Sequence, residues 1–259
     1  MTQESEIEVQ DNSAVYYEKR YSGYGLKYHK TVIDWMMDGI FFDHKVLDAG
    51  CGTGIISRIY TQYDISGIDI SNEMISRCPR WRVPKYNDDG KLMYSFSYGR
   101  HNLGTVDNIP GYVSGSMDAV VCRSLLHHLP DHKKALKEFH RVLKPGGKLV
   151  CWETNRGWLA QRVRERTQHG DRFSAYHHAF KPGELEKDLQ EAGFKVEEVR
   201  YMGFFAYPLF GFPDIANISK YIPFKPILFP LSLAVDYLLE STPFVNKLSW
   251  AVGIRATKI

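Results

Sequence analysis

Short apolar runs alternate with helical patterns along most of the chain, which is typical of an α/β sheet protein. The run Met117–Cys122 is almost continuously apolar, as in a strand buried on both faces. The polar stretch Pro79–Gly90 is predicted to be a loop. We expect seven strands, at Lys45–Ala49, Ile65–Ile70, Met93–Tyr98, Met117–Cys122, Lys148–Glu153, Lys195–Tyr201 and Leu248–Lys258.

Helix signals separate these runs. Asp131 can cap a helix that ends before Pro145, and Glu184–Ala192 lies between a proline and a glycine that suit the two ends of a helix. A tyrosine-rich helical pattern covers residues 14–37. Residues 1–13 are polar and acidic, and we expect them to be disordered.

The most informative stretch is Lys45–Gly54, in which a strand runs directly into a glycine-rich turn. Gly50, Gly52 and Gly54 let the backbone turn tightly and approach a ligand without Cβ atoms in the way. A second acidic position, Asp69, closes the next strand. A strand, a glycine turn, a helix and a later acid form the nucleotide-binding unit of a doubly wound sheet.

The spacing of this turn departs from that of a dinucleotide site. Ile55 stands where the third glycine of G-x-G-x-x-G would be, and Asp48 precedes the turn. A carboxylate there repels a pyrophosphate but attracts a ligand with an ammonium and a sulfonium group. S-adenosylmethionine carries both.

Several motifs resemble those of a known family. Val46–Gly54 and Gly67–Ser71 resemble the first two motifs of class I S-adenosylmethionine-dependent methyltransferases. Later stretches are similar in order and spacing to motifs of the small-molecule branch, as in quinone-biosynthesis methyltransferases: Asn108–Pro110, Gly115–Arg123, Leu125–Leu129 and Glu138–Gly147. The resemblance covers about residues 40–153. It implies a doubly wound, mostly parallel seven-stranded sheet with an antiparallel last strand, S-adenosylmethionine as cofactor and S-adenosylhomocysteine as product.

The resemblance also implies cofactor contacts at particular positions. Asp48 and the backbone of Gly50–Gly52, with Cys51 in the middle, match the part that holds the methionine end. Asp69 matches the acid that binds the ribose. Ile70 and Met74 are expected to pack against the adenine.

Two positions in the pattern leave alternatives open. Thr105 stands where the family usually has an acid that accepts from the adenine amino group, so either its hydroxyl accepts or Asp107 takes that role, with Val106 between them. Arg123 either presents its carbonyl to the ligand or places its side chain at a solvated rim.

The tyrosine-rich segment suggests a cover over the cofactor. In relatives this segment folds over the ligand, which would place Tyr17 and Tyr21 where ring faces attract the sulfonium cation and exclude water. Plain packing against the core is the alternative interpretation.

His127 and His128 follow the fourth predicted strand and are the candidate general bases. We expect one of them to face the site while the other packs away, although a histidine at this place can also simply shape the pocket wall. His177 and His178 are rival candidates, with an exposed polar turn as the alternative. Neither pair has carboxylates at metal-binding spacing, so we expect no metal.

Two stretches fall outside the minimal core, at residues 154–180 and 203–247. The second is rich in aromatic residues, which suits a pocket for an apolar acceptor or packing onto the core. The first carries five arginines, which form a solvated face or bind an anionic acceptor or membrane headgroup: Arg156, Arg162, Arg164, Arg166 and Arg172. We interpret both as caps on a single domain at 14–259, with a cover helix at 14–44 and the cofactor-binding core at 45–153.

Composition narrows the class of protein. The 259 residues are 44% hydrophobic, enough for one large α/β core, and the net charge of +3 gives no nucleic-acid footprint. The four cysteines are widely spaced and suit a reducing compartment. No leader pattern or spanning apolar run is visible, so we expect a cytoplasmic protein.

The function predicted from these features is in-line methyl transfer from S-adenosylmethionine to a small, apolar or lipid-like acceptor. The accepting atom, oxygen, carbon or nitrogen, stays open, and so does the oligomeric state. Nucleobase methylation is disfavoured because Cys122–His127 lacks the Asn/Asp-Pro-Pro-aromatic motif of that class. A macromolecule methyltransferase, or a protein that binds the cofactor without methylating, is the alternative.

Overall fold

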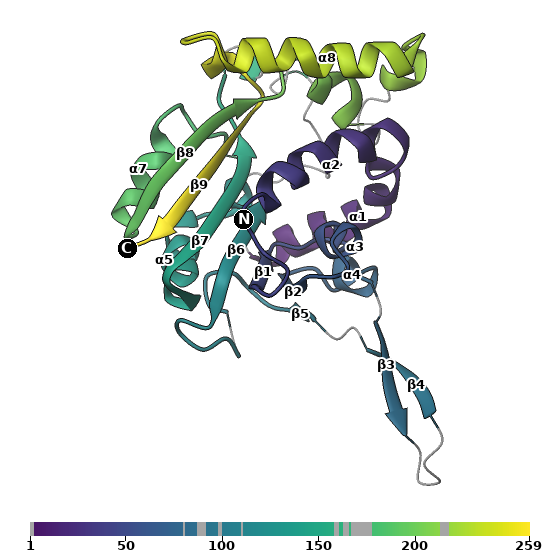
Figure 1. Ribbon diagram of the computed structural model, residues 1–259, viewed down its shortest axis with the longest axis vertical. Coiled ribbons are helices and arrows are strands. Elements are labelled where there is room, and N and C mark those ends of the chain that lie inside the picture. The colour runs from purple at the N-terminus through teal and green to yellow at the C-terminus, as the bar shows by residue number, and fades with distance from the viewer. Residues whose placement is uncertain are drawn as a thin grey trace.

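The computed structural model describes residues 3–79, 81–86, 92–97, 100–109, 111–157, 161–162, 166, 178–212 and 218–259. Its centre is one seven-stranded sheet (Figure 1). In spatial order the strands are β5 (His101–Leu103), β2 (Asp64–Asp69), β1 (Lys45–Ala49), β6 (Met117–Arg123), β7 (Leu143–Thr154), β9 (Ala251–Lys258) and β8 (Phe194–Met202).

The pairing confirms the predicted topology. β1 runs parallel to β2 and β6, and β7 runs parallel to β6, whereas the last strand, β9, is antiparallel to both β7 and β8. The chain moves outward from β1 to β2 and β5 and then returns to β6. The strand order therefore reverses between β1 and β6, and ligands of doubly wound sheets bind beyond the carboxyl ends of the strands at such a point.

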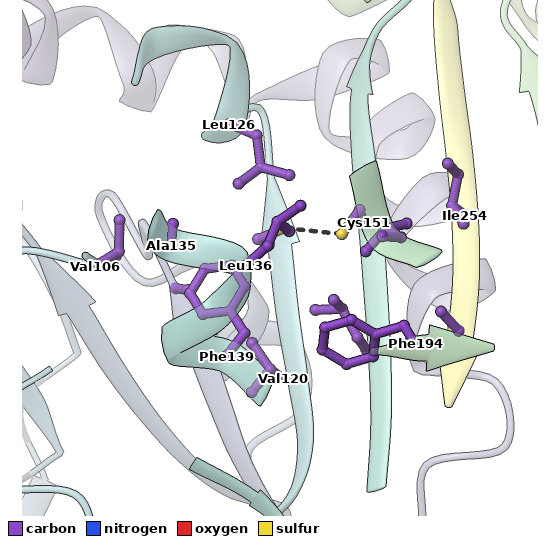
Figure 2. Packing of buried hydrophobic residues seen from close by; sticks show 14 of the residues in the cluster. Val106, Val120, Leu126, Ala135, Leu136, Phe139, Cys151, Phe194 and Ile254 are labelled. Carbon is purple, nitrogen blue, oxygen red and sulfur yellow. Dashed lines mark hydrogen bonds between the residues drawn. The ribbon is translucent and has the colours of Figure 1, made fainter. Parts of the chain in front are cut away.

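The helices bury an apolar core on each face of the sheet. On one face, Leu136 and Phe139 of α5 (His132–Val142) pack with Val120 and Phe194 (Figure 2). α7 (Glu184–Glu191) adds two buried leucines to the same core. On the other face, α2 (Gly23–Met37) packs with the short π-helical turn Tyr207–Gly211.

The remaining described helices are short or lie at the edges of the sheet. α3 (Ile55–Ile59) and α4 (Asn72–Ser76) follow β1 and β2. α8 (Lys225–Glu240) lies along one end of the molecule (Figure 1). Short 3-10 turns occupy Leu126–His128, Ile218–Tyr221 and Asn246–Leu248. None of the helices in these described ranges is long and apolar enough to cross a bilayer.

The N-terminal segment is helical, so the expectation of disorder is wrong for residues 3–13. α1 spans Gln3–Arg20 and packs against α4. Asp11 connects the two helices, because its carboxylate accepts hydrogen bonds from the Ser71 hydroxyl and, at 3.3 Å, from the Glu73 N–H. Tertiary contacts thus order a polar sequence that has little helical periodicity of its own.

The third predicted strand forms, but the expectation that it belongs to the central sheet is wrong. Residues 92–97 form β4 (Leu92–Ser97), which pairs antiparallel with β3 (Trp81–Tyr86) in a separate two-stranded arm that projects from the body (Figure 1). Much of the stretch 79–90, expected to be a loop, is therefore a strand. The third strand of the central sheet is β5, whose three residues are too few for a hydrophobic pattern to reveal.

Candidate active site

A cavity of about 290 Å³ lies beyond the carboxyl ends of the strands, where the strand order reverses. Segments that follow β1, β2, β5 and β6 form its floor, and α1 covers it. Among the described residues its lining includes Gly50, Cys51, Gly52, Asp69, Ile70, Met74, Thr105, Val106, Asp107, Arg123, Leu125, His128, Glu6, Gln10, Tyr17, Arg20 and Tyr21. Every predicted cofactor-binding residue except Asp48 thus lines one cavity.

The glycine turn after β1 needs residues without side chains. Gly50 has a φ of +68°, and a Cβ there would lie 2.7 Å from the Leu125 side chain. Gly52 has a φ of +53° and lies under the Tyr17 ring. Any larger residue would strain the backbone and fill the space beside the cavity.

Asp69 connects the turn to the end of β2. Its carboxylate accepts hydrogen bonds from the Gly52 N–H at 2.8 Å and from the Ser71 N–H at 2.9 Å. Burial raises the pKa of this carboxyl, and the backbone N–H groups of Ser71, Gly52 and Ile70 act against that rise. The same carboxylate lines the cavity, where its unused lone pairs can accept from ligand hydroxyls.

Asp48 lies outside the lining but close to it. Its side chain is buried, and among the described residues Oδ2 has no hydrogen-bond partner. Burial raises the pKa of Asp48 to about 7, and the nearby Arg123 guanidinium opposes that rise. An unsatisfied buried carboxylate oxygen is costly, and a cationic ligand group would remove the cost.

Arg123 is turned inward, so the interpretation of its side chain as a solvated rim charge is wrong. The guanidinium donates to the Tyr21 hydroxyl and, at 3.3 Å, to Nδ1 of His29. His29 in turn donates from Nε2 to the Gly211 carbonyl at 2.9 Å. Burial, with Arg123 and Arg20 nearby, lowers the pKa of His29 well below its ordinary value, so this imidazole is neutral.

The two predicted tyrosines lie over the cavity. Tyr17 and Tyr21 meet edge to face, with ring centroids 5.7 Å apart. The Arg20 guanidinium lies 4.4 Å from the Tyr17 ring centroid, and that of Arg123 lies 5.3 Å from Tyr21. The end of α1 and the turn after it thus form an aromatic cover that is held to the core through Arg123.

The predicted histidine pair is divided. His128 lines the cavity, and its Nδ1 lies 3.4 Å from a carboxylate oxygen of Glu6 in α1. His127 is buried away from the cavity, with Nδ1 2.6 Å from Glu153. His178 contacts Glu184 at 2.9 Å and lies outside the lining, whereas His177 falls outside the described residues.

Glu153 is a site-shaping residue that the sequence analysis missed. One of its oxygens accepts the N–H groups of Leu125 at 3.0 Å and Leu126 at 2.9 Å, and the other contacts His127. Burial raises the pKa of Glu153 to about 7, against the effect of these N–H groups. The carboxylate therefore fixes the turn that carries His128. Its signal in the sequence was an acid at the end of a predicted apolar strand.

Glu6 and Gln10 of α1 also line the cavity and were missed, because we expected this segment to be disordered. The two side chains share a hydrogen bond of 2.8 Å. Their spacing of four residues places both on one helical face. A polar helix that covers a ligand site leaves little trace in a hydrophobic pattern.

The predicted caps do not line the cavity in the described part of the chain. Tyr207 is buried in the core with α2, so the packing alternative holds for this ring, whereas Phe205 and Phe210 line a second pocket together with Leu228 and Leu231 of α8. Arg156, Arg162 and Arg166 are exposed. Arg164 and Arg172 fall outside the described residues.

Comparison with known proteins gives consistent matches. A family model described as a methyltransferase domain matches residues 23–199. A ubiquinone biosynthesis O-methyltransferase from Xanthomonas axonopodis pv. citri is 27% identical over 172 residues, with 61% of this chain and 65% of the relative covered. The aligned part of the chain thus spans just under two thirds of that relative's length.

Solved structures share the fold. A possible histamine N-methyltransferase from Thermotoga maritima superposes with a TM-score of 0.61 at 17% identity, covering 97% of this chain and 99% of that chain. A geranyl diphosphate C-methyltransferase from Streptomyces coelicolor A3(2), solved with S-adenosyl-L-homocysteine, gives 0.56 at 14% identity, covering 89% and 79%. At these identities the likeness concerns the architecture alone.

Proposed function

The chain belongs to the methyltransferase domain family, and from this premise we propose that it transfers a methyl group from S-adenosylmethionine to a hydroxyl oxygen of a small apolar acceptor. The family match confirms the predicted enzyme class and its cofactor, S-adenosylmethionine. The observation that carries the proposal is a single cavity in which the glycine turn and Asp69 lie together with His128.

The residues around the turn fit this cofactor. The unpartnered oxygen of Asp48 suits the ammonium of the methionine end, and Asp69 suits the ribose hydroxyls. Met74 is buried beside them and offers an apolar surface to the adenine. When bound, the cofactor supplies an electrophilic methyl group on a positively charged sulfur.

The acceptor side of the cavity combines apolar walls with one titratable ring. Leu125, Leu129 and Pro130 line it beside His128. Such walls hold an acceptor by burial and exclude water, while alignment of the reacting atoms can lower the barrier by about 7 to 11 kcal/mol. His128 takes the proton from the accepting group, which contributes typically 10²- to 10⁴-fold to the rate.

Oxygen is the accepting atom that these residues favour. A hydroxyl must lose its proton during transfer, and His128 lies where a base would serve it. Glu6 faces Nδ1 of His128, so its carboxylate can orient the ring and stabilise the proton that the ring takes up. The ubiquinone biosynthesis relative, which is named as an O-methyltransferase, supports the same choice.

A lipid-like acceptor is supported by the outer face of α8. Large apolar side chains are exposed there and just beyond it, at Phe224, Ile227, Leu231, Tyr237, Leu238 and Phe244. Of the charged residues in 218–248, Lys220 and Lys247 are exposed, Lys225 and Glu240 are partly buried, and Asp236 is buried. An apolar helical face with cations beside it suits contact with an anionic bilayer, where an apolar acceptor would be dissolved. We expect the chain to sediment with anionic vesicles but not with neutral ones. Sedimentation with both kinds to the same extent, or with neither, would contradict contact with an anionic bilayer.

The experiment that tests the function is methyl labelling. The full chain is incubated with S-adenosylmethionine labelled in the methyl group and with matched apolar phenols, amines and carbon acids. We expect label in the phenols, lost when the hydroxyl is capped. Label only in amines or carbon acids would contradict oxygen transfer. Label only in protein or RNA would contradict a small acceptor. If the chain binds the cofactor but labels nothing in a cell extract, a protein that does not methylate would be favoured.

A further inference from the structure

Three side chains with metal-binding chemistry meet beneath the glycine turn. The Sγ atoms of Cys51 and Cys78 and a ring nitrogen of His101 all lie within 4.8 Å of one another. All three side chains are buried. They come from the turn after β1, from the residues after α4 and from the start of β5, so three separate segments converge on one point.

Two glycines make this convergence possible. A Cβ at Gly54 would lie 3.2 Å from both Cys78 Sγ and His101 Nε2. A Cβ at Gly67 would lie 2.8 Å from Cys51 Sγ and 2.4 Å from the His101 ring. Any other residue at either position would therefore push the cluster apart.

The present contacts of these groups are weak enough to exchange. Cys78 Sγ lies 3.3 Å from the Gly52 carbonyl, and Cys51 Sγ lies 3.7 Å from the same oxygen. His101 Nε2 lies 3.1 Å from the Ser57 hydroxyl. Both cysteines are free thiols, and thiols are weak hydrogen-bond donors.

We propose that Cys51, Cys78 and His101 form a binding site for Zn²⁺. Two sulfur ligands and one imidazole suit zinc, which binds sulfur at about 2.3 Å and nitrogen at about 2.0–2.1 Å. Tetrahedral geometry then requires neighbouring ligand atoms about 3.8 Å apart at most. The cluster satisfies this after a contraction of about 1 Å or less.

Charge supports a cation at this place. On coordination each thiol loses its proton to solvent, and two thiolates balance Zn²⁺, so the buried centre carries no net charge. The Asp69 carboxylate accepts from the Gly52 N–H, next to Cys51 in the chain, and its negative charge favours a cation nearby. Asp69 is hydrogen-bonded to the turn that contains Cys51.

Zinc here would connect the cofactor turn to α4 and β5. Cys51 lies in the lining of the cavity, so a bound metal would hold the turn in the conformation that the structure shows. Zinc binding is independent of methyl transfer, and its failure would leave the proposed function intact. A metal-stabilised turn predicts a higher melting temperature of the full chain with zinc than after chelation.

The test is a titration of the reduced full chain with Co²⁺ under anaerobic conditions, followed by displacement with Zn²⁺. We expect one equivalent, a thiolate-to-cobalt charge-transfer band and intense visible bands of tetrahedral cobalt. Cys78→Ser and His101→Gln should each weaken binding at least tenfold. S-adenosylhomocysteine binding by calorimetry verifies that each variant is folded.

Cys122→Ser is the matched control. Cys122 is a buried cysteine whose sulfur lies 3.2 Å from that of Cys151. Among the described residues this pair belongs to no group of three metal-binding side chains. The control should bind cobalt as the unaltered chain does. The proposal would be overturned if the charge-transfer band were absent, or if Cys122→Ser lost as much affinity for cobalt as the ligand variants. A Cys51–Cys78 disulfide in protein purified without oxygen would also overturn it.

Discussion

Two buried carboxylates, Glu153 and Asp48, have similar titration behaviour and opposite surroundings. Burial raises the pKa of each to about 7. Glu153 accepts hydrogen bonds from three backbone N–H groups and contacts the His127 ring, whereas Oδ2 of Asp48 has no partner among the described residues. The protein satisfies one buried acid by itself, and the unpartnered oxygen of the other is the reason for the proposal that Asp48 binds the cofactor ammonium. A raised pKa alone therefore does not distinguish a candidate binding residue from a structural one. The distinction lies in whether the carboxylate oxygens have hydrogen-bond partners within the protein.

The same contrast divides the histidines. His127 shares the enclosed surroundings of Glu153, and His128, the next residue, faces the cavity. His127 and Glu153 fix the turn, whereas His128 is the proposed base. Substitutions on the two sides should therefore affect different quantities, stability on one side and binding or rate on the other.

The largest expected effect is on turnover. Replacing His128 with Gln removes the proposed base, so kcat should fall about 10²- to 10⁴-fold while affinity for S-adenosylhomocysteine stays unchanged. Steady-state kinetics with the acceptor found by methyl labelling measures this. His178→Gln is the control, since His178 lies outside the cavity and should leave kcat unaltered. A kcat retained within threefold in His128→Gln would show that this ring is not the base.

The next effect is on stability. Glu153→Ala leaves the N–H groups of Leu125 and Leu126 and the His127 ring without their partner, so the free energy of unfolding should fall by about 3–5 kcal/mol. Urea denaturation measures the change. Glu184→Ala removes the more exposed contact with His178 and should cost about 0–1 kcal/mol. Equal losses for the two substitutions would contradict the structural role of Glu153.

A smaller effect is expected on cofactor binding. Asp48→Asn removes the charge that faces the ammonium, so affinity for S-adenosylhomocysteine should fall about 10- to 100-fold. At pH 8 the unliganded variant should melt at a higher temperature than the unaltered chain. The raised pKa of Asp48 means that the folded protein loses stability as the pH rises toward 7 and this buried carboxyl ionises, and asparagine stays neutral. Calorimetry and thermal melts measure the two changes. A weaker affinity together with a higher melting temperature would show that Asp48 serves the cofactor. A fall in both would show that Asp48 stabilises the fold instead.

The smallest effect concerns the aromatic cover. Tyr21→Phe removes the hydroxyl that accepts from Arg123 while keeping the ring, so cofactor affinity should fall about 2- to 10-fold. Tyr63→Phe, at a tyrosine outside the cavity lining, is the control and should change nothing. Titration of both variants with S-adenosylhomocysteine makes the comparison. Unchanged affinity in Tyr21→Phe would mean that the contact with Arg123 does not hold the cover.

The sequence predicted the sheet and the cofactor turn because both depend on local patterns. Apolar runs mark the buried strands, and the glycines at 50 and 52 have the left-handed backbone that only such residues adopt easily. α1 was not predicted because contacts with residues distant in the sequence order it. The β3–β4 arm was not predicted because it depends on pairing within a short insertion. Asp11 of α1, for example, is held by Ser71.

The site could be predicted residue by residue only where a motif fixes it. The lining from Gly50 to Asp107 followed the motifs, whereas Glu6 and Glu153 depend on how separate elements pack. Tyr207 shows the opposite error. It belongs to an aromatic-rich stretch that suits a pocket, yet its ring fills the core beside α2. Composition does not distinguish the two uses of an aromatic ring.

The most direct test of the account is calorimetric titration of the full chain with S-adenosylhomocysteine at pH 7 in buffers of different ionisation enthalpy. One molecule should bind per chain. Because the pKa of unliganded Asp48 is about 7, ammonium binding should release about half a proton, so the heat should depend on the buffer. Asp48→Asn should abolish that dependence. No binding, or binding whose heat is the same in every buffer, would contradict the assignment of Asp48 and its cavity to the cofactor.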